Sequence, residues 1–377
     1  MPAGLYLHYP FCPYLCNYCD YFKSLYNKSD EQTLFDSLIT ETRLVAEEFP
    51  NTKIETIFIG GGTPSLAKID LLENWLKTVR ESFDIADDIE FSIECNPDSV
   101  SQEYLAALKD LGVTRPNFGI QTFDPDLLKQ IGRGHTPHQI QEAIYFANVL
   151  GFKSYGVDLL FGLPRQTSAM LKKDLSQLVD LAPPHISFYQ LTSEEGTQLY
   201  AEVSSGKVVL PDDSLVSAMY KIGCDKFLSA GYEHYEIASF AKEGQECRHS
   251  LNYWQGEDVV GLGPSAHSYL NGHRLANVES ISKYIESLKQ KKMPRILNEP
   301  ALLDRADETI ISSLRLRNGV DCKKFESMFG LPLKDRIDSK EHEKLMEAGL
   351  LLDDKDRLRL SDEGFYLADE IALRLLK

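Results

Sequence analysis

The chain has 377 residues, 43% of them hydrophobic, which is enough for a sizeable core and for two or three domains. Its formal net charge of −17 argues against nucleic acid and anionic membranes as partners, because both attract basic proteins. The sequence contains neither an apolar run long enough to span a membrane nor a signal peptide at its start, so we expect a cytoplasmic protein.

The first 195 residues alternate between short apolar segments and segments with helical periodicity. In the second helical segment, for example, Leu71, Leu72, Trp75, Leu76 and Val79 share one face. Strand, helix and parallel strand form the βαβ unit, so this rhythm predicts an α/β fold with a partial or complete TIM-like (β/α)6 barrel. The six predicted strands are Leu5–Tyr9, Glu55–Ile59, Glu90–Cys95, Asn117–Gln121, Gly156–Phe161 and His185–Gln190.

The second half of the chain has a different pattern. We expect a helix and then an irregular, glycine-rich segment within residues 211–290. Three helices, a hairpin and a last helix then predict a small C-terminal α+β domain that resembles a winged helix. This domain is too acidic for an ordinary DNA reader, so we expect it to serve structure or protein contacts. The predicted domains are 1–235, 236–295 and 296–377, and the predicted C-terminal elements are 301–315, 321–328, 339–348, Leu350–Leu352 and Leu358–Leu360.

Three of the seven cysteines form the motif Cys12-x3-Cys16-x2-Cys19, directly after the first predicted strand. Thiolates are soft ligands that suit iron–sulfur clusters, zinc or copper(I). Three thiolates on a four-iron cluster leave one iron open to a cofactor or substrate. Structural zinc, with His8 or a remote cysteine as its fourth ligand, is the alternative, although the sequence has no second CxxC.

Glycine or polar residues also stand at or after the ends of the next three strands, and Asp158 lies early in a later strand, where an unpaired charge is costly. If the strands form a barrel, these residues gather at the edge where barrel chemistry occurs. Each also has a plainer interpretation, as a tight turn, a solvated carboxylate, a surface arginine or a structural ion pair. The residues are Gly60-Gly61-Gly62-Thr63-Pro64, Glu94, Gln121 with Arg133, and Asp158.

The segment LYLHYPFCPYLCNYCDYF resembles the signature of the radical S-adenosylmethionine (SAM) superfamily, with Tyr18 as the aromatic residue before the last cysteine. The resemblance implies a [4Fe–4S] cluster on Cys12, Cys16 and Cys19, with the amino and carboxylate groups of SAM on the open iron. It continues in order through GGGTPS, IECNP, FGIQTFDPDLLKQIGR, VDLLFGLPRQT, YQLTSEEGT and YEIASFAKEGQECRHSLNYWQGEDVVGLGPSAHS. This series covers nearly the whole chain and resembles one branch, the oxygen-independent coproporphyrinogen III oxidases and the heme chaperones of the HemW type.

The resemblance also implies roles for single residues. Tyr6, Gly61 and Glu94 match positions that contact SAM in the family. A second group matches positions that bind a second SAM molecule in the oxidases: Tyr18, Gly62, Thr63, Gln121, Arg133 and Asp158.

Three features favour the chaperones over the oxidases. Only five residues precede Tyr6, whereas the oxidases carry an extension, and Tyr21 stands where the oxidases place a further cysteine. The chaperones carry a His-Asn-x-x-Tyr-Trp stretch linked to heme, which here is His249-Ser250-Leu251-Asn252-Tyr253-Trp254. Imidazole is a normal axial ligand of heme iron, and Tyr253 and Trp254 can stack on the macrocycle. A buried histidine among core aromatics is the alternative interpretation.

We therefore expect a heme chaperone that binds heme and passes it to an acceptor hemoprotein, with the oxidase as the alternative; whether SAM is cleaved stays open. Ser250 replaces the family asparagine, so a hydrogen bond that orients His249 can be lost. His267 is a further candidate ligand or pocket residue. The remaining expectations are surface positions for His135 and His138, and plain buried thiols at Cys95 and Cys247.

Overall fold

A computed structural model describes residues 2–300, 302–354 and 356–377 of the chain. Residues 301 and 355, which fall in a predicted C-terminal helix and in the predicted hairpin turn, lie outside the described residues. All six predicted strands are confirmed, and each runs parallel to the next. They are β1 (Pro2–Tyr9), β4 (Lys53–Gly61), β5 (Asp84–Cys95), β6 (Arg115–Gln121), β7 (Gly156–Phe161) and β8 (His185–Gln190).

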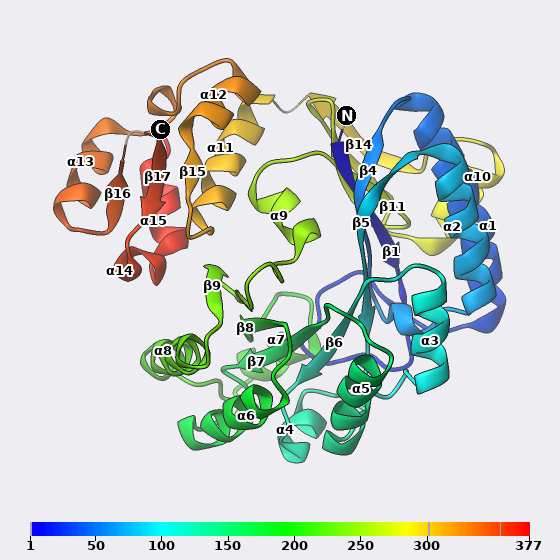
Figure 1. The fold of residues 1–377 in the computed structure, drawn as a ribbon, viewed down its shortest axis with the longest axis horizontal. Helices are drawn as coiled ribbons and strands as arrows, with labels where there is room; N and C mark the ends of the chain where they lie inside the picture. Colours follow the sequence, from blue (N-terminus) through cyan, green and yellow to red (C-terminus); the bar gives the residue numbers. More distant parts are fainter. Residues whose placement is uncertain (1, 301, 355) are drawn as a thin grey trace.

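The helices between these strands cover one face of the curved sheet (Figure 1). Leucine, isoleucine and phenylalanine side chains at alternate strand positions pack against the helices and form the main core. The helices are α1 (Lys28–Glu48), α2 (Ile69–Ser82), α3 (Gln102–Asp110), α4 (Pro125–Gln130), α5 (Pro137–Val149), α6 (Ser168–Leu181), α7 (Gln198–Ser204) and α8 (Asp213–Ser229).

The barrel is partial, because further strands extend the sheet at both sides without pairing its two edges within the described ranges. The order is β14-β13-β12-β11-β1-β4-β5-β6-β7-β8-β10-β9. The segment around Gly244–Gly263, which was expected to be irregular, instead contains the helix α9 (Arg248–Trp254) and the strand β11, and further strands precede and follow it. These strands have only three to six residues, too short for a clear alternating pattern. The added elements are β9 (Glu233–Glu236), β10 (Ser239–Ala241), β11 (Val259–Leu262), β12 (His267–Leu270), β13 (His273–Asn277), α10 (Ile281–Lys289) and β14 (Arg295–Pro300).

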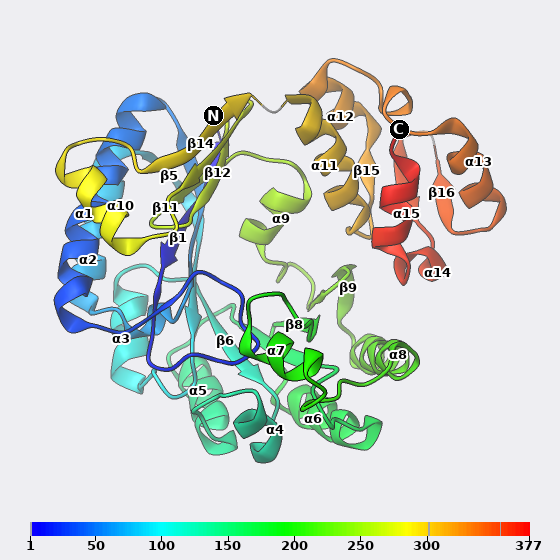
Figure 2. The same ribbon diagram turned by 180° about the vertical axis from the view of Figure 1, so that it is seen from behind.

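The concave face of the sheet, here called the lumen, carries the other set of alternate side chains. Strand register places Tyr6, Phe58, Ser92 and Arg115 side by side on β1, β4, β5 and β6. The helix α9 (Arg248–Trp254) lies inside the curve of the sheet, between the strands and the C-terminal domain (Figures 1 and 2). The lumen is therefore polar and aromatic, and α9 covers the part of it that lies toward the N-terminal ends of the strands.

The C-terminal domain has its own hydrophobic core and a small antiparallel sheet in the order β15-β17-β16. The predicted succession of three helices, hairpin and helix is confirmed, whereas the exact domain boundaries stay a prediction. The described helices include none that is long and apolar enough to cross a bilayer. The elements are α11 (Leu302–Leu314), β15 (Val320–Asp321), α12 (Cys322–Phe329), α13 (Ser339–Glu347), β16 (Leu351–Asp353), β17 (Arg357–Leu360), α14 (Asp362–Phe365) and α15 (Ala368–Leu375).

Candidate functional site at the rim and floor of the lumen

The cysteine loop follows β1 and crosses the C-terminal edge of the sheet, here called the rim. It begins with the short strand β2 (Phe11–Cys12), which pairs with β3 (Ser24–Leu25). The glycine turn after β4 docks on this loop, since Gly62 N–H donates to Tyr9 O at 2.7 Å and Thr63 N–H to Phe11 O at 2.8 Å. A Cβ on Gly62 would lie 2.7 Å from Phe11 O. Gly62 is thus needed for close contact between two backbone segments, which is a structural role beside any ligand contact.

The surroundings of the three thiols fit an iron–sulfur cluster. Arg133 Nη1 lies 3.8 Å from Cys16 Sγ, and Lys23 lowers the pKa of both Cys12 and Cys19 against the larger effect of burial. Cations and hydrogen-bond donors near thiolates stabilise the charge of a bound cluster. Among the described residues, no three acidic, histidine or cysteine side chains are arranged around a single metal ion. A four-iron cluster does not require that arrangement, since each thiolate binds a different iron atom.

His8 is not a free fourth ligand in this structure. Its Nε2 lies 2.8 Å from Phe22 O, and its Nδ1 lies 3.1 Å from the hydroxyl of Tyr6. Both ring nitrogens therefore have partners. The Cβ that Gly61 lacks would lie 2.7 Å from the same ring, so the glycine leaves room for it. His8 thus connects the glycine turn to β1 and to the cysteine loop, whose Phe22 carbonyl it contacts.

Two buried carboxyl groups, Glu94 and Asp158, lie on β5 and β7, which are separated by β6. Glu94 Oε2 accepts a hydrogen bond from Gly61 N–H at 3.1 Å, and burial, with a smaller contribution from Asp158, raises the pKa of Glu94 to about 8. Burial raises the pKa of Asp158 to about 6, and its Oδ1 has no partner in the described part of the chain. A hydrogen bond with Ser187 and the charges of Arg115 and Arg133 lower the pKa of Asp158 against this effect of burial.

Arg133 lies at the rim, where it was considered as a surface residue or a ligand. Its Nη2 donates to Asn96 Oδ1 at 2.8 Å and to Gly119 O at 2.6 Å, which holds the guanidinium over the strand ends. Its buried Nε finds no partner among the described groups. Gln121 ends β6 with a left-handed φ of 65°, a conformation that non-glycine residues seldom adopt. Arg133 and Gln121 both belong to the residues predicted from the sequence to bind SAM.

Thr63 and Tyr18 complete the predicted rim. Thr63 is buried beside the cysteine loop, where its Oγ1 lies 3.4 Å from Asn96 Nδ2 and its hydrogen bond to the Cys12 thiol lowers the pKa of that thiol. Tyr18 packs against a small hydrophobic cluster formed by α4, α7 and the end of β7. Asn17 anchors the loop beside it, since its Nδ2 donates to Gln130 O at 2.9 Å. The rim is therefore assembled mainly by backbone contacts and short side chains.

His249 lies nearer the N-terminal ends of the strands, in a region here called the floor, with Thr56, Phe58, Ser92 and Arg115. Tyr6 connects the floor to the rim, since its ring stacks on His249 with ring centres 6.4 Å apart and its hydroxyl lies 3.1 Å from His8 Nδ1. His249 is 2% exposed, and its ring stacks on Phe58 with ring centres 5.2 Å apart. Its Nδ1 lies 2.8 Å from Thr56 Oγ1, whereas Nε2 has no partner in the part of the chain described. Burial lowers the pKa of His249 to about 3, so the imidazole is neutral at physiological pH. A neutral imidazole with one unpartnered nitrogen is able to bind a metal ion.

Three residues that sequence reasoning missed hold His249 in place. Thr56 Oγ1 also accepts a hydrogen bond from Asn252 Nδ2 at 2.9 Å. Glu90 Oε1 accepts a hydrogen bond from the backbone N–H of His249 at 2.9 Å. Ser250 points elsewhere, with its hydroxyl 3.3 Å from Cys247 Sγ. The orientation of His249 therefore does not depend on residue 250. No local sequence signal identifies Thr56, because it contacts a residue 193 positions away.

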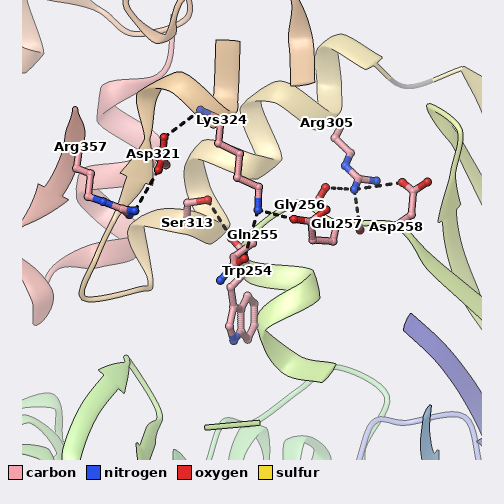
Figure 3. Close-up of polar contacts among 10 residues, drawn as sticks. All are labelled: Trp254, Gln255, Gly256, Glu257, Asp258, Arg305, Ser313, Asp321, Lys324 and Arg357. Carbon is pink, nitrogen blue, oxygen red and sulfur yellow. Dashed lines mark hydrogen bonds and ion pairs between the residues drawn. The ribbon is translucent and has the colours of Figure 1, made fainter. Parts of the chain in front are cut away.

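The two aromatic residues of the same stretch diverge. Tyr253 is 43% exposed and meets the His249 ring edge-on, with ring centres 5.5 Å apart. Trp254 faces the C-terminal domain instead: the Arg315 guanidinium lies 4.9 Å from its ring centre, and Ser313 Oγ donates to its carbonyl at 2.9 Å (Figure 3). The structure therefore groups His249 with Tyr253 and places the Trp254 ring against Arg315.

The end of α9 is fastened to the C-terminal domain by buried and half-buried polar contacts (Figure 3). Arg305, which is buried, donates to the carbonyl oxygens of Gly256 and Glu257, the latter at 2.7 Å. Lys324 forms an ion pair with the Glu257 carboxylate and lies 3.3 Å from Gln255 Oε1. The C-terminal domain thus fixes the segment that carries His249.

The other candidate histidines and thiols have varied surroundings: Cys247 contacts Glu90 beside α9, and His267 lines a cavity together with Tyr253. His267 is exposed on β12, and His138 is exposed on α5, where it lies 3.1 Å from Glu142. The expectation of a surface position for His135 was wrong, because the residue is buried with Nε2 2.9 Å from Ile120 O. Cys95 and Cys247 are buried free thiols, as expected.

Comparison with protein families agrees with this geometry. The model of the radical SAM superfamily matches residues 6–178, and that of the HemN C-terminal domain matches residues 301–367. A parallel (β/α)6 sheet with the cysteine loop at its C-terminal edge thus defines the class as radical SAM proteins, which implies a [4Fe–4S] cluster and SAM as cofactors.

Two curated relatives extend over the whole chain. A protein named heme chaperone HemW from Lactococcus lactis is 33% identical over 100% of this chain and 97% of its own length. A second protein of that name, from Bacillus subtilis, is 33% identical over 97% of each chain. The chain belongs to the HemW family.

A solved structure shares the fold. The coproporphyrinogen III oxidase HemN from Escherichia coli superimposes with a TM-score of 0.86 over 99% of this chain and 89% of that chain. The two sequences are 22% identical, so this likeness concerns the fold alone.

Proposed function

We propose that the chain is a cytoplasmic heme chaperone that binds one heme through His249 and passes it to an acceptor hemoprotein. The observation that carries the proposal is the neutral imidazole of His249, whose Nδ1 is held by Thr56 while its Nε2 has no partner among the described groups. Imidazole nitrogen is a common axial ligand of heme iron. Tyr253, half-exposed beside the ring, then contacts the macrocycle. The names of the full-length relatives support the same function.

At the rim, Cys12, Cys16 and Cys19 hold the cluster, whose open iron would bind SAM. Tyr6, Gly61 and Glu94 line the neighbouring wall, and the ionised Glu94 carboxylate accepts hydrogen bonds from SAM hydroxyl or amino groups. Arg133, with its unpartnered Nε, suits a carboxylate. When bound and reduced, the cluster supplies an electron that can cleave SAM. Tyr6, Gly61, Glu94 and Arg133 bind and orient the cofactors. Arg133 also holds its guanidinium beside the Cys16 sulfur.

The oxidase is the second candidate function. It is favoured by the fold shared with HemN and by the presence of Gln121, Arg133 and Asp158 at positions that serve the oxidases. Formation of protoporphyrinogen from coproporphyrinogen III, with SAM and a strong reductant under anaerobic conditions, would establish this activity. The absence of 5′-deoxyadenosine after the same reduction would remove radical chemistry from the proposal.

Heme titration of the anaerobically reconstituted protein tests the chaperone function. We expect saturable binding near one heme per chain, followed by Soret absorption. His249→Ala should weaken binding at least tenfold, or about 1.4 kcal/mol, because it removes the axial ligand. His267→Ala is the matched control, since His267 is exposed on β12, and should bind like the wild type. Absence of saturable binding, or equal loss in both variants, would contradict the proposal.

A further inference from the structure

Arg115 is a buried cation that forms no ion pair among the described residues, although its charge acts on the buried carboxyl of Asp158, whose pKa it lowers against the larger effect of burial. Arg115 is 1% exposed at the floor of the lumen, and Nη1 donates to Ser154 Oγ at 2.7 Å and to Gln245 O at 3.1 Å. Nε and Nη2 have no partner in the described ranges, and no described carboxylate lies within ion-pairing distance of the guanidinium. Burial of a charge costs several kcal/mol unless the charge is paired, so such an arginine indicates a position for an anionic ligand.

The two unpartnered nitrogens define the class of anion. Nε and one Nη form one edge of the guanidinium fork, the geometry that binds a carboxylate through two parallel hydrogen bonds. Four further buried side-chain atoms without hydrogen-bond partners lie on the strands β5 to β8. They are Ser92 Oγ on β5, Asn117 Oδ1 on β6, Asp158 Oδ1 on β7 and His185 Nδ1 on β8. The described part of the floor is therefore built for a polar group that the chain itself does not supply.

Strand register places this group near His249. Phe58, on whose ring His249 stacks, is the register partner of Ser92, and Ser92 is the register partner of Arg115. Two strand spacings, about 10 Å, therefore separate the backbone of Phe58 from that of Arg115. Gln245, which accepts from Arg115, lies four residues before His249 in the same segment. One ligand with a metal centre and a flexible acidic arm spans this separation, as heme does with its propionates.

We propose that the Nε–Nη2 edge of Arg115 binds a propionate carboxylate of the heme whose iron is ligated by His249. The inference rests on the proposed function, which it deepens by naming how the macrocycle is oriented. The chain has a net charge of −17, so long-range electrostatics favour an uncharged ligand over an anionic one. A preference for the anionic form therefore requires a local cation such as Arg115.

The test compares heme with its dimethyl ester, in which both propionates are neutral, on the full-length reconstituted protein. We expect the wild type to bind heme at least tenfold more tightly than the ester. In Arg115→Met, which keeps the length of the side chain and removes its charge, the two ligands should bind with nearly equal affinity. Arg43→Met is the matched control, because Arg43 is exposed on α1, and should keep the wild-type preference.

A second variant covers the case in which Arg115→Met does not fold. Asn117→Asp places a carboxylate beside Arg115 without altering its contacts with Ser154 and Gln245, and it should lower the preference for heme over the ester. Equal binding of heme and ester by the wild type would overturn the proposal. So would a folded Arg115→Met protein that loses affinity for both ligands by the same factor, since that result indicates a structural role.

The two proposals fail in different ways. If the wild type prefers heme to the ester but His249→Ala binds heme normally, the axial ligand is wrong and the Arg115 site stands. If His249→Ala abolishes binding while the wild type does not distinguish heme from the ester, the Arg115 site is wrong and the heme chaperone stands. If neither ligand binds saturably, both proposals are wrong.

Discussion

The rim and the floor of the lumen are built by different means. At the rim, backbone groups determine the arrangement: the glycine turn docks on the cysteine loop through Gly62 and Thr63. At the floor, side chains distant in the sequence hold one another, as Thr56 and Glu90 hold His249. A site assembled from backbone contacts within short segments leaves a motif in the sequence. A site assembled from scattered side chains leaves almost none.

The difference also concerns charge. Rim cations lie near thiols, with Arg133 beside Cys16 and Lys23 acting on Cys12 and Cys19. The floor keeps His249 neutral and leaves Arg115 without an ionic partner among the described residues. The rim therefore suits an anionic cluster held by thiolates. The floor suits a metal ion bound by a neutral nitrogen, together with an anionic arm.

The largest expected effect tests the rim alone. Cys16→Ala should abolish the broad iron–sulfur absorption after anaerobic reconstitution, because two thiolates cannot hold the cluster. Cys224→Ala, which removes a buried thiol of α8, should keep full iron and sulfide content. Iron and sulfide analysis with visible absorption makes the measurement. A cluster of normal content in Cys16→Ala would contradict the assignment of the cysteine loop.

A smaller effect concerns the pH dependence of SAM binding. The pKa of Glu94 is raised to about 8, so the carboxyl is mostly protonated at pH 7 and mostly ionised at pH 9. Since the ionised form accepts hydrogen bonds from SAM, affinity should rise with pH, by about tenfold across this interval. Calorimetric titration of the cluster-loaded protein measures it. Glu94→Gln should remove this dependence of SAM affinity on pH. An equal pH dependence in that variant would assign the titration to another group.

The smallest expected effect tests how the floor orients His249. Thr56→Val removes the hydroxyl at nearly constant volume and should weaken heme binding about fivefold, or ~1 kcal/mol, with a shifted Soret band. Thr56→Ser should restore both. Ser250→Asn should change neither, because Ser250 contacts Cys247 rather than His249. Recovery of affinity by Ser250→Asn, without an effect of Thr56→Val, would return the orienting role to residue 250.

The sequence predicted the rim better than the floor for physical reasons. The six parallel strands have clear apolar composition, and the Cys12, Cys16 and Cys19 spacing lies within one loop, so both were visible locally. Strands β9 to β14 were missed because they have only three to six residues, too few for a clear alternating pattern. His135 was misplaced because a polar residue gives no sign of burial when its partner is a remote backbone carbonyl.

The floor could not be predicted from the sequence, because its residues come from different strands and are brought together only by the register between those strands. Arg115 stands at the start of a strand, where an arginine ordinarily reaches solvent, and only the curvature of the sheet buries it. Trp254 was grouped with His249 by the sequence, but the structure separates their side chains. It belongs to the same short motif as His249, but its ring contacts Arg315 of the C-terminal domain instead. Proximity in the sequence was therefore a poor guide to a shared contact.

The central claim is that His249 ligates heme iron at the floor of the lumen, and pulsed electron paramagnetic resonance tests it most directly. The wild-type protein, carrying ¹⁵N-labelled histidine and one equivalent of ferric heme, should show hyperfine coupling from one imidazole nitrogen. That coupling should be lost in His249→Ala and kept in His267→Ala. Absence of the coupling in the wild type, or its persistence in His249→Ala, would contradict the account.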